Sequence, residues 1–192
     1  LTKGIKGSNI FRTVFFMPNL IGGIVLGYIW SMIFDGILSR YNTSILLNST
    51  YGFWGLIILM AWQQIGYMMI IYIAGLQAVP GDMLEAAKID GASEWKTLWD
   101  IIIPNVMPSI TICTFLTLTN SFKLYDQNLA LTNGRPYNGA IHTTEMLALN
   151  IVNSNTLKTK GVGQAKAVMF FVLVAIIGIF QMKSTHDKEV QQ

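Results

Sequence analysis

Four long apolar stretches constrain this chain more than any other feature of its sequence. They cover residues 14–34, 53–76, 105–125 and 165–183. Each comes close to or exceeds the length of about 20 mostly apolar residues that a membrane-spanning helix needs. Only 12% of the residues are charged, against about 25% in soluble domains. The sequence therefore predicts an all-α integral membrane protein, with four transmembrane helices in a single domain over residues 1–192.

Charge and motif content argue against several other classes of protein. The formal net charge of +3 is spread thinly, without the basic runs of nucleic-acid-binding proteins. The single cysteine, Cys113, cannot form an intrachain disulfide and is expected to be a packing residue. His142 and His186 have no partners at metal-ligand spacing, so no metal site is predicted. No phosphate-binding Gly-x-x-x-x-Gly-Lys-Ser/Thr loop and no Ser-His-Asp constellation occurs, so we expect the chain not to hydrolyse ATP itself.

The positive charges at the start of the chain predict its orientation. Lys3, Lys6 and Arg12 precede the first apolar stretch without an acidic residue among them. Cytoplasmic segments of membrane proteins carry an excess of Lys and Arg, so this end is expected in the cytoplasm. Alternation across four spans then places residues 80–104 in the cytoplasm and residues 126–164 outside.

The segment 80–104 is a short charged island between two apolar stretches. Asp82 precedes Glu85 by three residues, a pattern that caps the start of a helix. Gly91 suits the left-handed position that closes a helix. Ser93 can cap a second short helix reaching residue 100, and Pro104 can open the next span. We expect a helix–turn–helix knob with a tightly turned centre.

The spacing within this island resembles a known family motif. Glu-Ala-Ala, three residues, Gly, nine residues and Ile-x-Leu-Pro is the cytoplasmic "EAA" coupling loop in permease subunits of bacterial ABC importers. The chain departs from it only at Ile103, where the family usually has Leu. Without the complete spacing of this motif, the island would predict only an amphipathic surface loop whose carboxylates are solvated. The resemblance assigns ATPase coupling to Glu85, Ala86, Ala87, Asp90, Gly91 and Pro104.

The resemblance also implies a fold, partners and a location. The fold would be the type I ABC importer permease helical bundle, multi-pass in the bacterial cytoplasmic membrane. The implied partners are an ABC ATPase dimer that binds the ATP, a second permease subunit and an extracytoplasmic solute-binding protein, so no cofactor is expected in this chain. In the knob, Glu85 would pair with a basic residue of the ATPase, Ala86 would permit close approach and Gly91 would hold the turn. Such permeases carry about two helices before the position of Leu1, so we expect a longer natural protein.

Two softer matches indicate the kind of solute. Residues 15–19, Phe-Phe-Met-Pro-Asn, and residues 131–136, Leu-Thr-Asn-Gly-Arg-Pro, resemble carbohydrate permeases of the maltose and glycerol-phosphate type. Arg135 stands where that family often has Gly. Residues 144–152 could form a short amphipathic helix in the outer segment. The resemblance therefore implies a sugar as the solute.

Polar side chains inside two of the apolar stretches suggest a solute path. Such groups are costly in lipid and usually face a bundle interior or a wet cavity. Uncharged amides and hydroxyls suit a sugar, whose hydroxyls both donate and accept hydrogen bonds. Positions equivalent to several of them line the sugar site of the resembled family. The candidate path comprises Gln63, Gln64, Tyr67, Thr117, Asn120 and Ser121.

Other interpretations remain open at this point. The same polar groups could simply join helices by hydrogen bonds worth about 0.6–2 kcal/mol each. Within the same class, the solute could be another neutral molecule. From a different class, a membrane-embedded enzyme acting on a lipid-linked substrate would need paired carboxylates or histidines near the interface, and the acids of residues 80–104 could superficially serve. A purely structural membrane anchor would have no use for polar faces within its helices.

Overall fold

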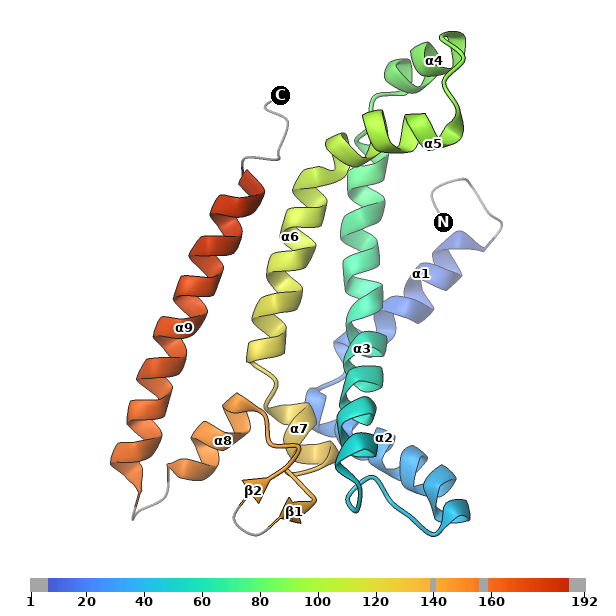
Figure 1. Cartoon of the computed structure of the whole chain (residues 1–192). Helices are drawn as coiled ribbons and strands as arrows, with labels where there is room; N and C mark the ends of the chain where they lie inside the picture. Colours follow the sequence, from blue (N-terminus) through green and yellow to red (C-terminus); the bar gives the residue numbers. More distant parts are fainter. Residues whose placement is uncertain (1–6, 139–140, 156–158, 187–192) are drawn as a thin grey trace.

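The computed structural model describes residues 7–138, 141–155 and 159–186 and is mostly helical (Figure 1). Lys3 and Lys6 lie outside the described residues, as do the side chains of His142 and His186. A two-residue antiparallel pair, β1 and β2, is the one sheet among the described residues. The elements are α1 (Ser8–Phe16), η1 (Met17–Leu20), α2 (Gly23–Leu38), η2 (Ser39–Tyr41), α3 (Ser49–Gln77), α4 (Gly81–Ile89), α5 (Glu94–Thr97), η3 (Leu98–Ile102), α6 (Ile103–Phe122), α7 (Asp126–Leu131), β1 (Tyr137–Asn138), β2 (Ile141–His142), α8 (Leu147–Ser154) and α9 (Lys160–His186).

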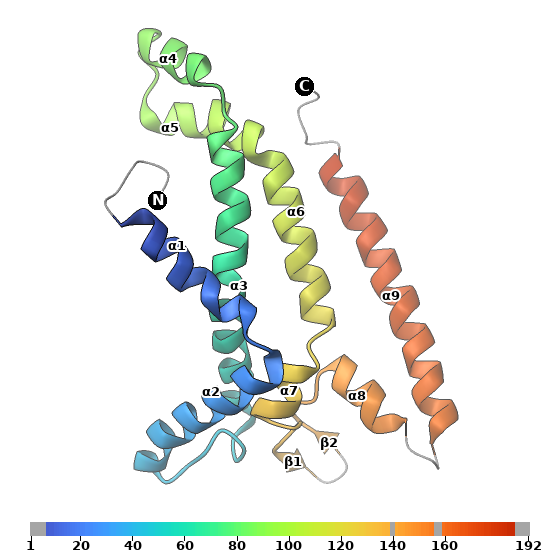
Figure 2. The same cartoon turned by 180° about the vertical axis from the view of Figure 1, so that it is seen from behind.

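Three of the four expected spans are single long helices. The helices Ser49–Gln77, Glu94–Phe122 and Lys160–Lys183 are each long and apolar enough to cross a membrane. The second of these joins α5, η3 and α6 without a break, so it starts well before the expected residue 105. α3 and α6 run side by side, with α9 along α6 (Figures 1 and 2).

The expected single helix over residues 14–34 is wrong, because the chain forms a broken pair there. α1 with η1 and α2 with η2 meet at 103°, and together they count as one further span at most. The change of direction begins near Pro18, where the α-helix α1 gives way to the 3-10 turn η1. Ile21 and Gly22 then take extended backbone conformations before α2 starts. A proline lacks the N–H that an interior helical turn requires, which explains why the helix ends here.

Small residues allow the broken pair to pack closely. A Cβ atom on Gly66 of α3 would lie 1.8 Å from the carbonyl oxygen of Phe15, so α1 crosses α3 backbone to backbone. A Cβ atom on Gly27 of α2 would lie 2.5 Å from the Cβ of Ala130 in α7. Helices in membranes associate through such close approaches, since lipid offers no hydrophobic driving force between them. The glycines therefore fix where α1 and α2 sit.

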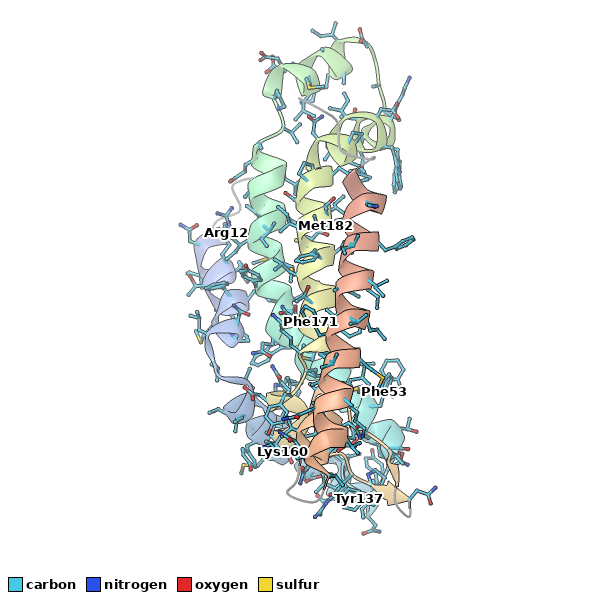
Figure 3. The ribbon with its side chains drawn as sticks, turned by 90° about the vertical axis from the view of Figure 1, so that its left-hand side faces the viewer. Arg12, Phe53, Tyr137, Lys160, Phe171 and Met182 are labelled. Atoms are coloured by element: carbon cyan, nitrogen blue, oxygen red, sulfur yellow. The ribbon has the colours of Figure 1, made fainter. Side chains whose placement is uncertain are left out.

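The two ends of the molecule differ in packing. α4 and α5 project at one end, and α2, α7, α8 and the β1–β2 pair gather at the other (Figure 1). The main apolar core lies at this second end, where Ile45, Leu56, Leu59 and Leu131 are almost fully buried. In Figure 3, Arg12 and Met182 lie in the half nearer α4, whereas Lys160 and Tyr137 lie at the opposite end. The spanning window of α9 has no fully buried residue, although one side of this helix contacts α6 and α8.

A buried hydrogen-bond network organises the segment after α6. The Asn128 side chain donates to the Thr132 hydroxyl at 3.0 Å and to the Thr144 carbonyl at 2.8 Å. It also accepts from the Met146 backbone N–H at 2.9 Å. These bonds tie α7 to the start of α8, which forms close to the expected position at residues 144–152. Satisfied buried amides of this kind hold one arrangement, because each alternative leaves a polar group unpaired.

The close crossing of α1 and α3 gives a first prediction. Replacing Gly66 by Ala forces two backbones apart, and overpacking of this kind costs about 1–3 kcal/mol or more. We expect the full-length protein in detergent to unfold at a midpoint lower by about 5 °C or more. The matched control is Gly36→Ala in α2, where a Cβ meets nothing within 4 Å. Equal midpoints for the two variants would contradict the close crossing.

Candidate functional site

The knob, residues 80–104, opens with a helix whose start differs from expectation. α4 begins at Gly81 with Pro80 in the capping position and no side-chain cap. The expected Asp82 cap with Glu85 reaching back is therefore wrong. The extended conformation of Pro80 starts the helix before Asp82, which lies in the first turn instead. There its charge still interacts favourably with the positive end of the helix dipole.

The centre of the knob closes as the sequence predicts. Gly91 has a φ of +70°, the left-handed conformation that L side chains rarely adopt. The Ala92 N–H donates to the Ala87 carbonyl at 2.9 Å, and the Gly91 N–H donates to the Lys88 carbonyl at 3.1 Å. This is the Schellman pattern of helix ends. The turn that reverses the chain thus depends on a glycine.

One row of exposed side chains runs along α4. Asp82, Glu85, Ala86 and Ile89 follow the spacing of a single helical face and are all exposed. Ile89 is 86% exposed, an unusual state for a large apolar side chain, while Ala87 on the inner face is only 6% exposed. The row combines two carboxylates with an apolar tip, which is suited to contact with another protein.

A groove runs between the two halves of the knob. It has a volume of about 630 Å³. Four of the six predicted coupling residues line it, whereas Glu85 faces outward and Pro104 lies in the first turn of α6. The lining residues are Met83, Ala86, Ala87, Asp90, Gly91, Ala92, Ser93, Lys96, Thr97, Asp100 and Ile101.

The second half of the knob is continuous with a span. The Ser93 hydroxyl accepts from the Lys96 N–H at 3.3 Å, so Ser93 caps α5 as expected. No new helix opens at Pro104, because a π turn over Leu98–Ile102 carries α5 into α6. The π turn directly precedes Pro104. In a regular α-helix, the ring of Pro104 would clash with the backbone carbonyl four residues earlier, and the wider turn avoids this clash. Knob and span therefore share one helix.

Two exposed tryptophans in the second half of the knob were not identified in the sequence analysis. Trp95 is 70% exposed and Trp99 is 61% exposed. They are four residues apart and so lie on one helical face. The available signal was an aromatic pair at helical spacing just before an apolar stretch.

Near the middle of α3, predicted path residues come together. The Gln63 amide donates to the Ile21 carbonyl at 3.4 Å and accepts from the Gln127 amide at 2.8 Å. The Asn120 amide donates to the Gln64 side chain at 3.2 Å, joining α6 to α3. Gln63, Gln64 and Asn120 line one hollow of about 330 Å³. Its other lining residues are Asn19, Met60, Lys123, Tyr125, Asp126 and Gln127.

The remaining predicted path residues lie elsewhere. Thr117 and Ser121 line a separate hollow of about 350 Å³ beside Tyr72. The Ser121 hydroxyl donates to the Thr117 carbonyl at 2.8 Å, a bond within their own helix. Tyr67 is half-buried and lines neither hollow.

Sequence reasoning missed four polar members of the first hollow, namely Asn19, Lys123, Asp126 and Gln127. Asp126 and Gln127 directly follow the third apolar stretch and were assigned to the outer segment. Asn19 was noted as part of a motif and not as a lining residue. Cys113 is buried with its Sγ 3.8 Å from the Met68 carbonyl oxygen, in line with the expected packing role. Among the described residues, no three His, Cys, Asp or Glu side chains gather as a metal site requires.

A broken first span, a helical knob at one end and an amide-lined hollow nearer the other define a multi-pass helical membrane protein. The chain belongs to the family described as binding-protein-dependent transport system inner membrane components, whose model matches residues 2–183. It is a transport permease of the bacterial cytoplasmic membrane and not an enzyme. Membership in this family excludes the membrane-embedded enzyme and the simple anchor considered above.

Several curated relatives resemble the whole chain. A probable starch degradation products transport system permease protein, AmyD of Thermoanaerobacterium thermosulfurigenes, is 42% identical over 200 aligned residues, covering 100% of this chain and 67% of the relative. MsmF, a multiple sugar-binding transport system permease protein of Streptococcus mutans, is 30% identical, covering 99% and 68%. MalF, a trehalose/maltose transport system permease protein of Thermococcus litoralis, is 29% identical, covering 95% and 64%. The chain thus spans about two thirds of the length of these relatives.

Solved structures support the same fold. A bacterial ABC transporter involved in the import of the acidic polysaccharide alginate superposes with a TM-score of 0.75 at 16% identity, covering 96% of this chain and 67% of that one. The same type of transporter, in complex with an alginate pentasaccharide-bound periplasmic protein, gives 0.74 at 18% identity, covering 97% and 69%. The expected importer-permease helical bundle is therefore confirmed.

The double role of Gln63 gives a second prediction. Gln63→Leu leaves the Ile21 carbonyl and the Gln127 amide without this partner, at a cost of about 1–3 kcal/mol for a buried unpaired group. We expect a lower thermal midpoint for the full-length protein. Gln77→Leu, an exposed glutamine on the same helix, is the control. Adding Gln127→Leu to Gln63→Leu should cost less than the sum of the single changes, and strict additivity would contradict the bond.

Proposed function

We propose that this permease forms, with a second permease subunit, the translocation path for a sugar in an ABC importer. The observation that carries the proposal is the hollow lined by Gln63, Gln64 and Asn120 beside the break between η1 and α2. Amide groups donate and accept hydrogen bonds without a fixed charge, as the hydroxyls of a sugar require. Relatives named for starch degradation products, multiple sugars and trehalose or maltose support this assignment.

The charges near the hollow favour a neutral solute over an anion. Lys123 and Asp126 both line it, so the hollow has no net excess of positive charge. An anion carrier would gain from unpaired Arg or Lys there. Thr117 and Ser121 in the neighbouring hollow, with Tyr67 on α3, continue the proposed path along the same two helices.

The knob is the proposed contact for a separate ATPase dimer, which would bind and hydrolyse the ATP. The exposed row with Glu85, Ala86 and Ile89 supports this role, because it offers a carboxylate beside an apolar tip. On this proposal the knob lies in the cytoplasm. The opposite end, with α7 and α8, would face the extracytoplasmic solute-binding protein.

The path assignment gives a third prediction. Gln64→Ala removes an amide from the hollow and should lower uptake of radiolabelled maltotriose about tenfold, as expected for one or two lost hydrogen bonds. Uptake is measured in cells that express the full importer. Gln77→Ala, outside the hollow, should transport normally. Unchanged uptake by Gln64→Ala, with the native protein active on maltotriose, would remove Gln64 from the path.

The coupling assignment gives a fourth prediction. The full-length permease is co-expressed with its partner permease and ATPase, and recovery of the ATPase with the tagged permease is measured. Glu85→Lys should reduce recovery about tenfold or more, because a buried partner charge would be left unpaired. Glu94→Lys makes the same charge change at an exposed position on α5 and should recover the ATPase normally. Equal recovery for both variants would contradict coupling through Glu85.

A further inference from the structure

The two exposed tryptophans of the knob lie at a defined depth relative to the membrane. Residues 101–122 contain no charged side chain and are bounded by Asp100 and Lys123. As a helix this stretch is about 33 Å long, which matches a hydrocarbon core of about 30 Å. Trp99 therefore stands at the edge of the hydrocarbon core, and Trp95 lies one helical turn away on α5, which runs across the ends of the spans (Figures 1 and 2).

Trp95 and Trp99 also face the same way as the exposed side of the span. Steps of four residues, with five across the π turn, lead from Trp99 through Pro104 and Pro108 to Ile112. Pro108 and Ile112 are exposed. The tryptophan face is thus continuous with a surface of α6 that belongs in lipid.

The arrangement of the knob separates this face from the proposed ATPase contact. α5 lies between α4 and the ends of the spans, while α4 is the outermost element (Figures 1 and 2). The carboxylates Asp82 and Glu85 stand on the exposed face of α4, one helix away. α5 itself carries the exposed Lys96 next to Trp95.

We propose that α5 and η3 form a membrane-surface segment that Trp95 and Trp99 anchor in the lipid headgroup region at the knob end. Tryptophan is enriched at this depth, because its ring is apolar and its N–H still reaches polar partners. The proposal goes beyond ATPase coupling: one half of the knob contacts lipid, and the other half remains free for a protein partner.

The test measures depth with an attached fluorophore. The full-length permease and its partner permease are reconstituted in phosphatidylglycerol-containing vesicles, in a background whose native cysteines, including Cys113, are replaced by alanine. An environment-sensitive fluorophore is attached after Trp99→Cys or, as the matched position on α4, after Glu85→Cys. Quenching by lipids brominated near the glycerol backbone is compared for the two positions, with and without the ATPase.

The anchor proposal gives a definite result. The label at position 99 should be quenched at least about twofold more than the label at position 85, with or without the ATPase. A label at 99 that reports water in the vesicles, or that is shielded only when the ATPase is added, would overturn the anchor and assign the tryptophans to a protein interface. A label at 85 that the ATPase leaves unchanged would instead contradict the coupling assignment, so the two failures are distinguishable.

A second readout does not depend on labelling. Trp95→Phe combined with Trp99→Phe should reduce the part of the intrinsic tryptophan emission that these shallow brominated lipids quench, while the exposed Trp54 and Trp62 on α3 keep the rest. Trp30→Phe, on α2 with the ring partly buried against Phe34, is the single-site control and should leave that part in place. Undiminished quenching in the double variant would also overturn the anchor.

Discussion

The arrangement at the end of the molecule opposite the knob depends on one backbone carbonyl that the break in the first span frees from helical hydrogen bonding. A break in a spanning helix frees backbone groups, and in lipid these must find partners within the protein. The Ile21 carbonyl is such a group, and the Gln63 amide meets it from α3. Because the same side chain also accepts from Gln127, it joins the break to α7. Beside this junction lies the hollow, so the interaction that tolerates the broken helix also places amides where a solute can meet them.

The two ends of the permease differ in whether their polar side chains are buried and hydrogen-bonded or exposed. At the far end Asn128 is fully buried and its amide is satisfied by Thr132, Thr144 and Met146, which fixes one arrangement of the segment after α6. At the knob end, carboxylates and large apolar side chains remain exposed on short helices. Buried polar groups whose hydrogen bonds are all satisfied suit a rigid part of the structure, whereas an exposed surface with both charged and apolar side chains suits binding to a partner. The contrast fits a protein that holds a path at one end and meets partners at the other.

The sequence predicts the elements whose signals are local. Three spans, the Gly91 turn and the Ser93 cap each depend on residues within one or two turns, and each is confirmed. The 103° bend was not predictable, because its angle is set by contacts of Gly66 and Gly27 with distant backbone. Only part of the hollow could be predicted. The amides inside the apolar stretches are recognisable in the sequence, but the lining residues on η1 and α7 come close to them only in the folded chain. The wrong Asp82 cap shows how a proline can override a favourable capping pattern.

The unbroken helix from Glu94 to Phe122 has a mechanical consequence. α4 is attached through non-helical joints at Pro80 and Gly91, whereas helical hydrogen bonding continues from α5 through the π turn into α6. α5 turns sharply away from α6 at the π turn (Figures 1 and 2), so the 20 residues of α6 form a stiff lever about 30 Å long. A tilt of only about 10° at the knob would move the opposite tip of α6 by about 5 Å, given that length. Asn120 sits near that tip, so such a stroke would pull it out of reach of Gln64.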